Sequence, residues 1–394
     1  MKTLLRLPRG RSLGVLAVAA TMVVALSLTA VSSAITYRLP QNVRGSGSDA
    51  TYHVSSALDQ LYNESPGCNT IIPSGTQPLD QECISDPNNP DVTTENTFHD
   101  VVSENYPIGG GAGVNQLCSQ TLANVAPIDY ARQSSPYSAS NCTGLHFVAY
   151  ARDAVTFEVF PGLAGSALAS QNNTSGACNG VARPCLTQAQ LTGIYNCTIT
   201  NWNQVGGANA TINLFTVLPQ YGTSKFWYTE LGDTFSSSCG TAIHQTNNAE
   251  IPAAKQPNAI YFVSVGNWTE RYKKHPGGSA LGKIDGVAAT AANIQSGAFP
   301  FGRFLYNVFC AGDPTKGNKC GSASPASAAT VAYVGENGWL CKATAHTTDP
   351  VTGTNYRTEI ANTITKYGFV NLPKGATGGG TAFNNYCRLT TAGS

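Results

Sequence analysis

Three short segments of the chain have a composition suited to binding an anion. Each places Gly, Ser or Thr after a predicted strand and before a predicted helix, at residues 45–52, 109–114 and 222–224. A helix N-terminus offers free N–H groups and a partial positive charge, and glycine lets a ligand approach the backbone. Such turns are also ordinary in Gly-rich proteins. Only several of them meeting at one place would cradle a tetrahedral oxyanion without a metal.

The segments around these turns alternate between predicted strands and predicted helices, which is typical of an α/β protein. Val54, Ala57 and Leu58 recur at helical spacing and predict a helix over residues 50–62. A buried strand is predicted over residues 125–130, with Asp129 at its end. The further elements are helices over 114–122, 186–195 (N-cap Thr187) and 226–231, and strands over 146–151, 154–159, 213–218, 260–265 and 304–309.

Several blocks of sequence resemble the phosphate-binding components of ABC transporters and their actinobacterial relatives. The blocks are GSGSDATYHVSSALDQLY, YPIGGGAGVNQL, IDYARQSSPY, FVAYARDAVTF and LPQYGTSKFW, and the most specific is LTQAQLTGIYNCTITNWNQVGG. The resemblance implies a two-domain type 2 periplasmic-binding-protein-like α/β fold, with a central cleft and two interdomain crossovers. The expected domains are residues 35–148 together with 297–394, and residues 149–296.

The resemblance also implies which residues contact the ligand. The resemblance implies that Asp129 accepts the proton of the bound oxyanion in a hydrogen bond. A carboxylate can accept from a protonated oxyanion, whereas it repels a fully deprotonated one such as sulfate. The arginine that the family has before its third turn is missing here, where Val217 lies near its place, and Arg152, Lys225 and Arg132 are the candidate replacements. The predicted ligand-binding residues are Ser48, Thr51, Tyr52, Gly111, Asp129, Arg152, Gly222, Thr223 and Ser224.

These features predict a receptor that captures phosphate or a similar small oxyanion for the permease of an ABC transporter. It is expected to act as a monomer, to need no cofactor and to catalyse no reaction. A secreted or surface protein that reuses the fold with a different ligand, or none, is the alternative. The missing arginine, the missing lipid anchor and the many cysteines favour it. A secreted hydrolase would need a nucleophile–base pair. The net charge of +1 gives no reason to expect a nucleic-acid partner.

The N-terminus has the layout of a secretory signal. Basic residues from Lys2 to Arg11 precede an apolar run over residues 13–31, and small residues follow, so cleavage is expected after Ala34. An uncleaved membrane anchor is the alternative. No cysteine follows the run directly, so a lipoprotein anchor is not expected. Export would place the mature chain in a secreted or extracytoplasmic location.

The chain contains twelve cysteines, an even number that suits six disulfides in an oxidising compartment. Their spacing with histidine fits no zinc site. Spacing alone leaves the connectivity open, and pairing sequence neighbours is the simplest choice. It predicts Cys68–Cys83, Cys118–Cys142, Cys178–Cys185, Cys310–Cys320 and Cys341–Cys387, and leaves Cys197–Cys239.

Overall fold

The computed structural model describes residues 42–63, 101–104, 109–120, 128–134, 142–174, 176–232, 239–244, 250–272, 278–341, 353–372, 383–384 and 387–390. All of them belong to one structural unit, which comprises Pro40–Thr70 and Pro78–Ser394. The predicted signal segment, residues 1–34, and the predicted pair Cys68–Cys83 lie outside the described residues.

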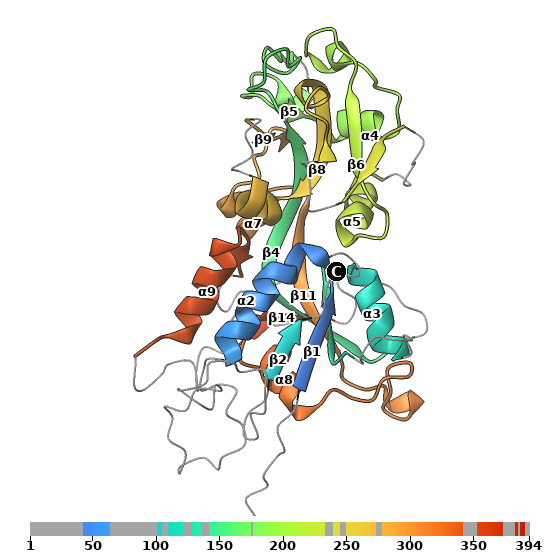
Figure 1. Ribbon diagram of the computed structural model, residues 1–394, viewed down its shortest axis with the longest axis vertical. Coiled ribbons are helices and arrows are strands. Elements are labelled where there is room, and N and C mark those ends of the chain that lie inside the picture. The colour runs from blue at the N-terminus through green and yellow to red at the C-terminus, as the bar shows by residue number, and fades with distance from the viewer. Residues whose placement is uncertain are drawn as a thin grey trace, which may run out of the picture. The chain divides into compact units, whose positions relative to one another are not determined.

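A mixed sheet organises the described chain, in the strand order β2-β1-β3-β11-β4-β8-β6-β7 (Figure 1). Strand β1 is parallel to β2 and β3, and β6 is parallel to β7 and β8, whereas β4 and β11 run antiparallel to each other. Parallel neighbours need crossover connections, which here contain helices. The strands of this path are β1 (Asn42–Gly47), β2 (Val101–Glu104), β3 (Tyr130–Gln133), β4 (Leu145–Val159), β6 (Asn213–Val217), β7 (Thr241–Ile243), β8 (Ala259–Ser264) and β11 (Gly302–Cys310).

Shorter strands complete the sheet at the edge of β4. Three of them, β12, β13 and β14, come from the C-terminal part of the chain, and β9 also pairs with β4. Strands β5 and β10 form a separate two-stranded sheet. These strands are β5 (Cys185–Leu186), β9 (Ala280–Leu281), β10 (Lys283–Ile284), β12 (Val370–Asn371), β13 (Phe383–Asn384) and β14 (Cys387–Thr390).

Strand β4 is one element where the sequence predicted two. The apolar runs over residues 146–151 and 154–159 are separated by the charged Arg152 and Asp153, which suggested a break. Both residues instead continue the pairing with β11, Arg152 opposite Phe304 and Asp153 opposite Arg303. Strand β4 therefore runs without a break through Arg152 and Asp153 and is 15 residues long.

The helices follow the predicted order but begin earlier than predicted at two of the three Gly-containing turns. Helix α3 starts at Gly110 rather than at residue 114, and α5 starts at Gly222 rather than at residue 226. Thr187 caps α4 as predicted, in a reciprocal capping box with Gln190. The helices are α2 (Tyr52–Asn63, after the 3-10 turn Asp49–Thr51), α3 (Gly110–Ser119), α4 (Gln188–Tyr195), α5 (Gly222–Leu231), α6 (Val265–Asn267), α7 (Ala291–Ser296), α8 (Ala328–Val334) and α9 (Tyr356–Lys366).

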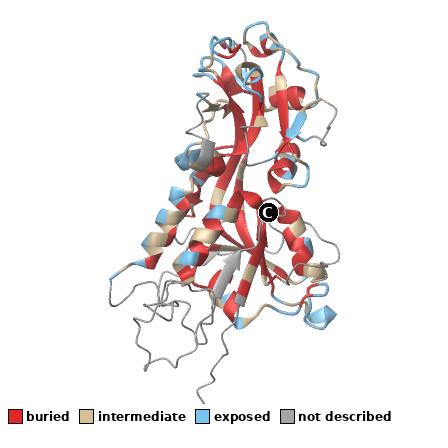
Figure 2. Ribbon diagram, in the orientation of Figure 1, coloured by how far each residue is buried: buried red, intermediate tan, exposed pale blue. Residues whose placement is uncertain are grey.

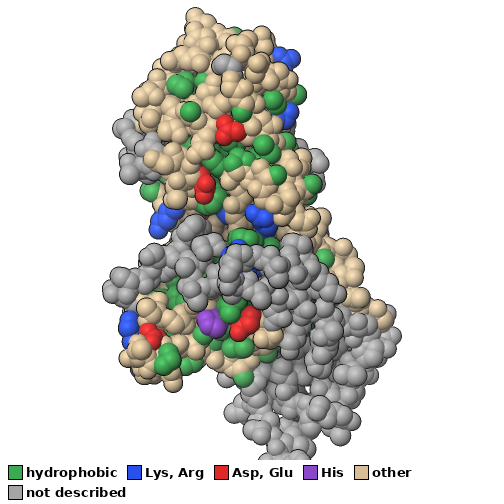
Figure 3. All heavy atoms as spheres, turned by 180° about the vertical axis from the view of Figure 1, so that it is seen from behind, with side chains coloured by type: hydrophobic (Ala, Val, Ile, Leu, Met, Phe, Trp, Pro, Cys, Tyr) green, Lys and Arg blue, Asp and Glu red, His purple; other side chains and the backbone are tan. Residues whose placement is uncertain are grey.

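Buried residues follow the strands and the inner sides of the helices (Figure 2). One hydrophobic cluster draws its buried members from residues 154–301 and Val370, and includes Trp202 and Trp227. Two others draw theirs from residues 43–151 and 305–387. Where Figure 3 draws described residues, few charged side chains show, as expected for a chain with only 11% charged residues.

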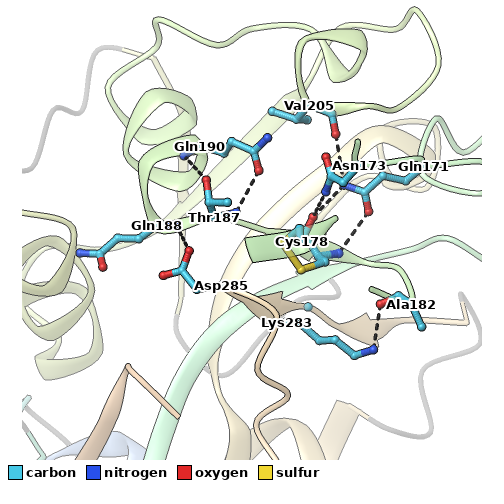
Figure 4. The surroundings of a disulfide bond; sticks show 12 residues. Gln171, Asn173, Cys178, Ala182, Thr187, Gln188, Gln190, Val205, Lys283 and Asp285 are labelled. Carbon is cyan, nitrogen blue, oxygen red and sulfur yellow. Dashed lines mark hydrogen bonds between the residues drawn. A yellow bond between two sulfur atoms is a disulfide. The ribbon is translucent and has the colours of Figure 1, made fainter. Parts of the chain in front are cut away.

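Five of the predicted disulfides are confirmed: Cys118–Cys142, Cys178–Cys185, Cys197–Cys239, Cys310–Cys320 and Cys341–Cys387. Around Cys178–Cys185 the amide of Gln171 accepts from the backbone N–H of Cys185 and donates to its carbonyl (Figure 4). Within the described part of the chain, no helix has both the length and the apolar character needed to cross a membrane.

Candidate anion-binding site

The first Gly/Ser turn connects β1 to α2 and is anchored on β3. Gly47 has a φ of 132°, and a Cβ there would collide with the backbone of Arg132, so glycine is required. The backbone N–H of Ser48 donates to the carbonyl of Arg132 (2.9 Å), and its hydroxyl lies 2.9 Å from that of Ser134. The Thr51 hydroxyl donates to the Ser48 carbonyl (3.2 Å). The turn is therefore held against the carboxyl end of β3.

The second turn begins α3 and lies directly against the first. The N–H of Gly109 donates to the carbonyl of Gly47 (3.0 Å). A Cβ on Gly113 would lie 2.5 Å from the Cα of Gly47, which leaves no room for a side chain. Glycine therefore brings the start of α3 into backbone contact with the end of β1, which explains why this helix begins among its glycines.

The third turn begins α5 and reaches the second. A Cβ on Gly109 would lie 2.7 Å from the carbonyl oxygen of Gln220, and one on Gly111 would lie 3.2 Å from the Nζ of Lys225. In Figure 1 the starts of α2 and α3 accordingly lie beside the lower end of α5. The three turns meet at one place, and the free N–H groups of their helices meet with them.

A buried arginine that the sequence did not indicate lies beside the third turn. Arg303 on β11 is 4% exposed, and its Nη2 donates to the Thr223 hydroxyl at 3.1 Å. The same guanidinium forms an ion pair with Asp153, through Nη2 at 2.7 Å and Nε at 3.0 Å. Among the described residues, its Nη1 has no hydrogen-bond partner. Arg303 thus brings a guanidinium to the turn where the resembling family has one.

A second buried guanidinium, that of Arg132, lies beside the first turn. Its Nε donates to the Ser48 carbonyl (3.2 Å), and it lies over the ring of Tyr52 at 5.5 Å. Burial lowers the pKa of Arg132 to about 10, so the group still carries its charge at neutral pH. Two fixed cations therefore flank the place where the turns meet.

Two other acids near these arginines, Asp49 and Asp59, have raised pKa values. Burial raises the pKa of Asp49 to about 7, against the opposing effects of backbone N–H groups and of the charges on Arg303 and Arg132. Burial likewise raises the pKa of Asp59 to about 7, although it accepts hydrogen bonds from Tyr333 (2.6 Å) and Tyr130 (3.3 Å). The negative charge that opposes an anion is correspondingly reduced.

Asp129 is not brought to the three turns. Of the strand predicted over residues 125–130, residues 125–127 lie outside the described residues. Ile128 and Asp129 are not part of a strand, and β3 begins at Tyr130, after the acid. The Asp129 carboxylate accepts from the N–H of Arg44 (2.8 Å), and burial raises its pKa. Strand β1 is parallel to β3, so Asp129 lies at the end of β3 opposite to Ser134, roughly 16 Å away at ~3.3 Å per residue. Ser134, which directly follows β3, instead lies beside Ser48 of the first turn.

Arg152 also lies apart from the turns. Side chains alternate along β4, so Arg152 and Asp153 point to opposite faces. The Arg152 guanidinium donates to the carbonyl of Gln295 in the last turn of α7 (2.9 Å) and lies 4.9 Å from the centre of the Phe304 ring.

The remaining predicted residues belong to the turns themselves. Gly222 is the first residue of α5, and Ser224 is buried, with its hydroxyl donating to the carbonyl of Val217 (3.2 Å). The structure therefore brings together Ser48, Thr51, Tyr52, Gly111, Gly222, Thr223 and Ser224. It confirms that Arg132, one of the candidate replacements for the family arginine, lies beside the turns, and it adds Arg303, Ser134 and Asp49. Ser134 and Asp49 lie within the matched blocks, whereas nothing in the sequence indicated Arg303.

Comparison with known proteins agrees with this architecture. The family model of a PBP superfamily domain matches residues 89–332, more than half of the chain. A substrate-binding protein from Clostridium perfringens, assigned to phosphate ABC transport and solved with bound phosphate, is 15% identical with a TM-score of 0.51. The match covers 84% of this chain and 100% of that one.

Two further solved structures are similar. An ABC-type phosphate transport receptor from Vibrio cholerae is 16% identical with a TM-score of 0.49, covering 84% of this chain and 100% of that one. A phosphate-binding protein from Stenotrophomonas maltophilia is 12% identical with a TM-score of 0.46, covering 84% and 91%. No curated protein matches the sequence. The type 2 fold expected from the sequence is confirmed, and the chain belongs to the PBP superfamily.

Proposed function

We propose that the protein is an extracytoplasmic receptor that binds phosphate or a similar small oxyanion and delivers it to the permease of an ABC transporter. One observation carries the proposal: three helix-starting turns meet beside Arg303, a buried arginine that already binds Thr223 of the third turn. Backbone N–H groups at helix starts and a planar guanidinium are the donors that recognise tetrahedral oxyanions.

The proposed receptor binds its ligand and performs no reaction on it. The hydroxyls of Ser48 and Thr223 orient the oxyanion, while Arg303 and Arg132 balance its charge. The related protein from Clostridium perfringens contains phosphate, which supports this choice of ligand. The missing family arginine was one of three grounds for the alternative of a surface protein with a different ligand or none, beside the missing lipid anchor and the many cysteines. Arg303 and Arg132 supply guanidinium groups from other strands and weaken that one ground.

Export is part of the proposal. Five disulfides among the described residues favour an oxidising compartment, in agreement with the predicted signal segment over residues 1–34. We propose that the mature protein acts as a monomer at the cell surface or in the periplasm. The domain division at residues 148 and 297 stays a prediction.

The test is calorimetric titration of the mature protein with phosphate and with sulfate. Arg303→Lys keeps the charge but loses the planar fork, and Thr223→Val removes one hydroxyl at nearly constant shape. Each should weaken oxyanion binding by about 10-fold or more, because a hydrogen bond to a charged group contributes about 1.5–3 kcal/mol. Arg152→Lys is the matched control from the other face of the sheet, and its affinity should equal that of the wild type.

Two results would overturn the proposal or its geometry. A folded wild-type protein, verified by circular dichroism, that binds neither anion removes the proposed function. Weaker binding in Arg152→Lys, with normal binding in Arg303→Lys, would instead return the missing arginine's role to the residue that the sequence favoured.

A further inference from the structure

Lys225 lies where a cation is electrostatically unfavourable. It is the fourth residue of α5, in the first helical turn, and its side chain is exposed. The N-terminus of a helix carries a partial positive charge, so acids are favoured there and lysine is disfavoured. An exposed lysine usually avoids such a position by extending into water.

The Lys225 side chain instead reaches the start of a second helix. Its Nζ lies 3.2 Å from the position that a Cβ on Gly111, the second residue of α3, would occupy. The ion pairs of the described residues are His146–Glu336, His244–Glu250 and Arg303–Asp153, and none of them includes Lys225. The ammonium group therefore lies between two positive helix ends, and no carboxylate of the described residues pairs with it.

A second observation at this place points independently to an anion. Arg303 is 4% exposed, binds Thr223 two residues before Lys225, and keeps an Nη1 with no hydrogen-bond partner among the described residues. A buried donor left without an acceptor is costly, typically about 1–3 kcal/mol. Two cations thus approach the first turn of α5, one from inside the protein and one from its surface.

We infer that Lys225 is a ligand-binding residue that contacts the oxyanion from α5 and is held by it against the start of α3. The inference rests on the proposed function, and assigns one further contact within that site. The anion supplies the negative charge that both helix ends and the ammonium group lack. Binding would then connect α5 to α3 through the ligand and Lys225.

Gly111 offers a way to test the position of Lys225 without removing its charge. Among the described residues outside its own helix turn, a Cβ at residue 111 would meet only the Lys225 Nζ within 4 Å, at 3.2 Å. Alanine is favoured over glycine in a helix, so Gly111→Ala should not lower the melting temperature. It should weaken anion binding by displacing the ammonium group. If Gly111→Ala weakens anion binding without lowering the melting temperature, the loss of affinity does not come from a loss of stability.

The experiment is a double-mutant cycle, measured by calorimetric titration with phosphate at low salt. We expect Lys225→Met to weaken binding about 10-fold and Gly111→Ala about threefold. In the Lys225→Met background, Gly111→Ala should have no further effect, because the two changes act through one contact. Lys255→Met is the matched control, an exposed lysine elsewhere in the chain, and should bind as the wild type does.

The outcomes separate this inference from the proposed function. Wild-type affinity in Lys225→Met, in a protein that binds phosphate, overturns the role of Lys225 and leaves the receptor function in place. Additive losses in the double variant would show that Gly111→Ala acts on α3 itself and overturn the contact. A wild-type protein that binds no oxyanion overturns both.

Discussion

Two neighbouring regions of the sheet use arginine in opposite ways. On one face Arg303 is buried at the start of α5, a positive helix end, where it needs the ion pair with Asp153. On the other face Arg152 is half-buried at the last turn of α7 and donates to the carbonyl of Gln295. A cation is favoured at a helix C-terminus without help and disfavoured at an N-terminus. The comparison shows that the helix end beside an arginine decides whether the arginine needs a carboxylate partner.

The largest effect should come from separating the buried pair. Arg303→Met leaves Asp153 buried without its partner, which typically costs about 3–5 kcal/mol of unfolding free energy. Arg152→Met removes a half-exposed contact and should cost about 1 kcal/mol or less. Urea unfolding of both variants measures the difference. Equal losses of stability would show that the two faces do not differ as described.

Asp49, which lies close to Arg303 and Arg132, should contribute one part of the pH dependence of stability, and Asp59 a second part. Asp49 has a pKa of about 7 when folded against an ordinary value of 3.8, so the folded protein holds its proton more tightly. Its contribution to stability is therefore complete below about pH 4 and is lost as the pH rises to about 7.

Asp49→Asn should remove this slope. The difference in unfolding free energy between wild type and variant should change by on the order of 4 kcal/mol between pH 4 and pH 8, at about 1.4 kcal/mol per pKa unit. Urea unfolding at several pH values measures it. A difference that does not vary with pH would mean that Asp49 is not held in the protonated form.

The smallest expected effect is on phosphate affinity, in variants at the two ends of β3. Ser134→Ala should weaken phosphate binding about fivefold, since it removes the hydroxyl beside Ser48 and a neutral hydrogen bond contributes about 1 kcal/mol. Asp129→Asn, at the far end, should leave the affinity within about twofold of the wild type. Calorimetric titration decides. A large loss of phosphate affinity in Asp129→Asn would restore the proton-accepting role that the family resemblance gave to this acid.

The sequence by itself determined features that depend on neighbouring residues. The helix predicted over residues 50–62 and the cap of α4 at Thr187 follow from local patterns, and the structure agrees with them. Pairing cysteines that are neighbours in sequence also gave the short-range disulfides. The matched blocks fixed the superfamily, because they preserve residue types at the spacing that the fold needs.

Only the tertiary structure decided which charged side chains meet. Arg303 reaches Asp153 across 150 positions and Thr223 across 80, through the antiparallel pairing of β11 with β4. A shift of one residue in that register would turn Arg303 to the other face of the sheet, because side chains alternate. The same alternation separates Arg152 from Asp153, which are adjacent in sequence. Strand register and the start of β3 depend on contacts over long distances in the chain, so local patterns could not assign the arginine or place Asp129.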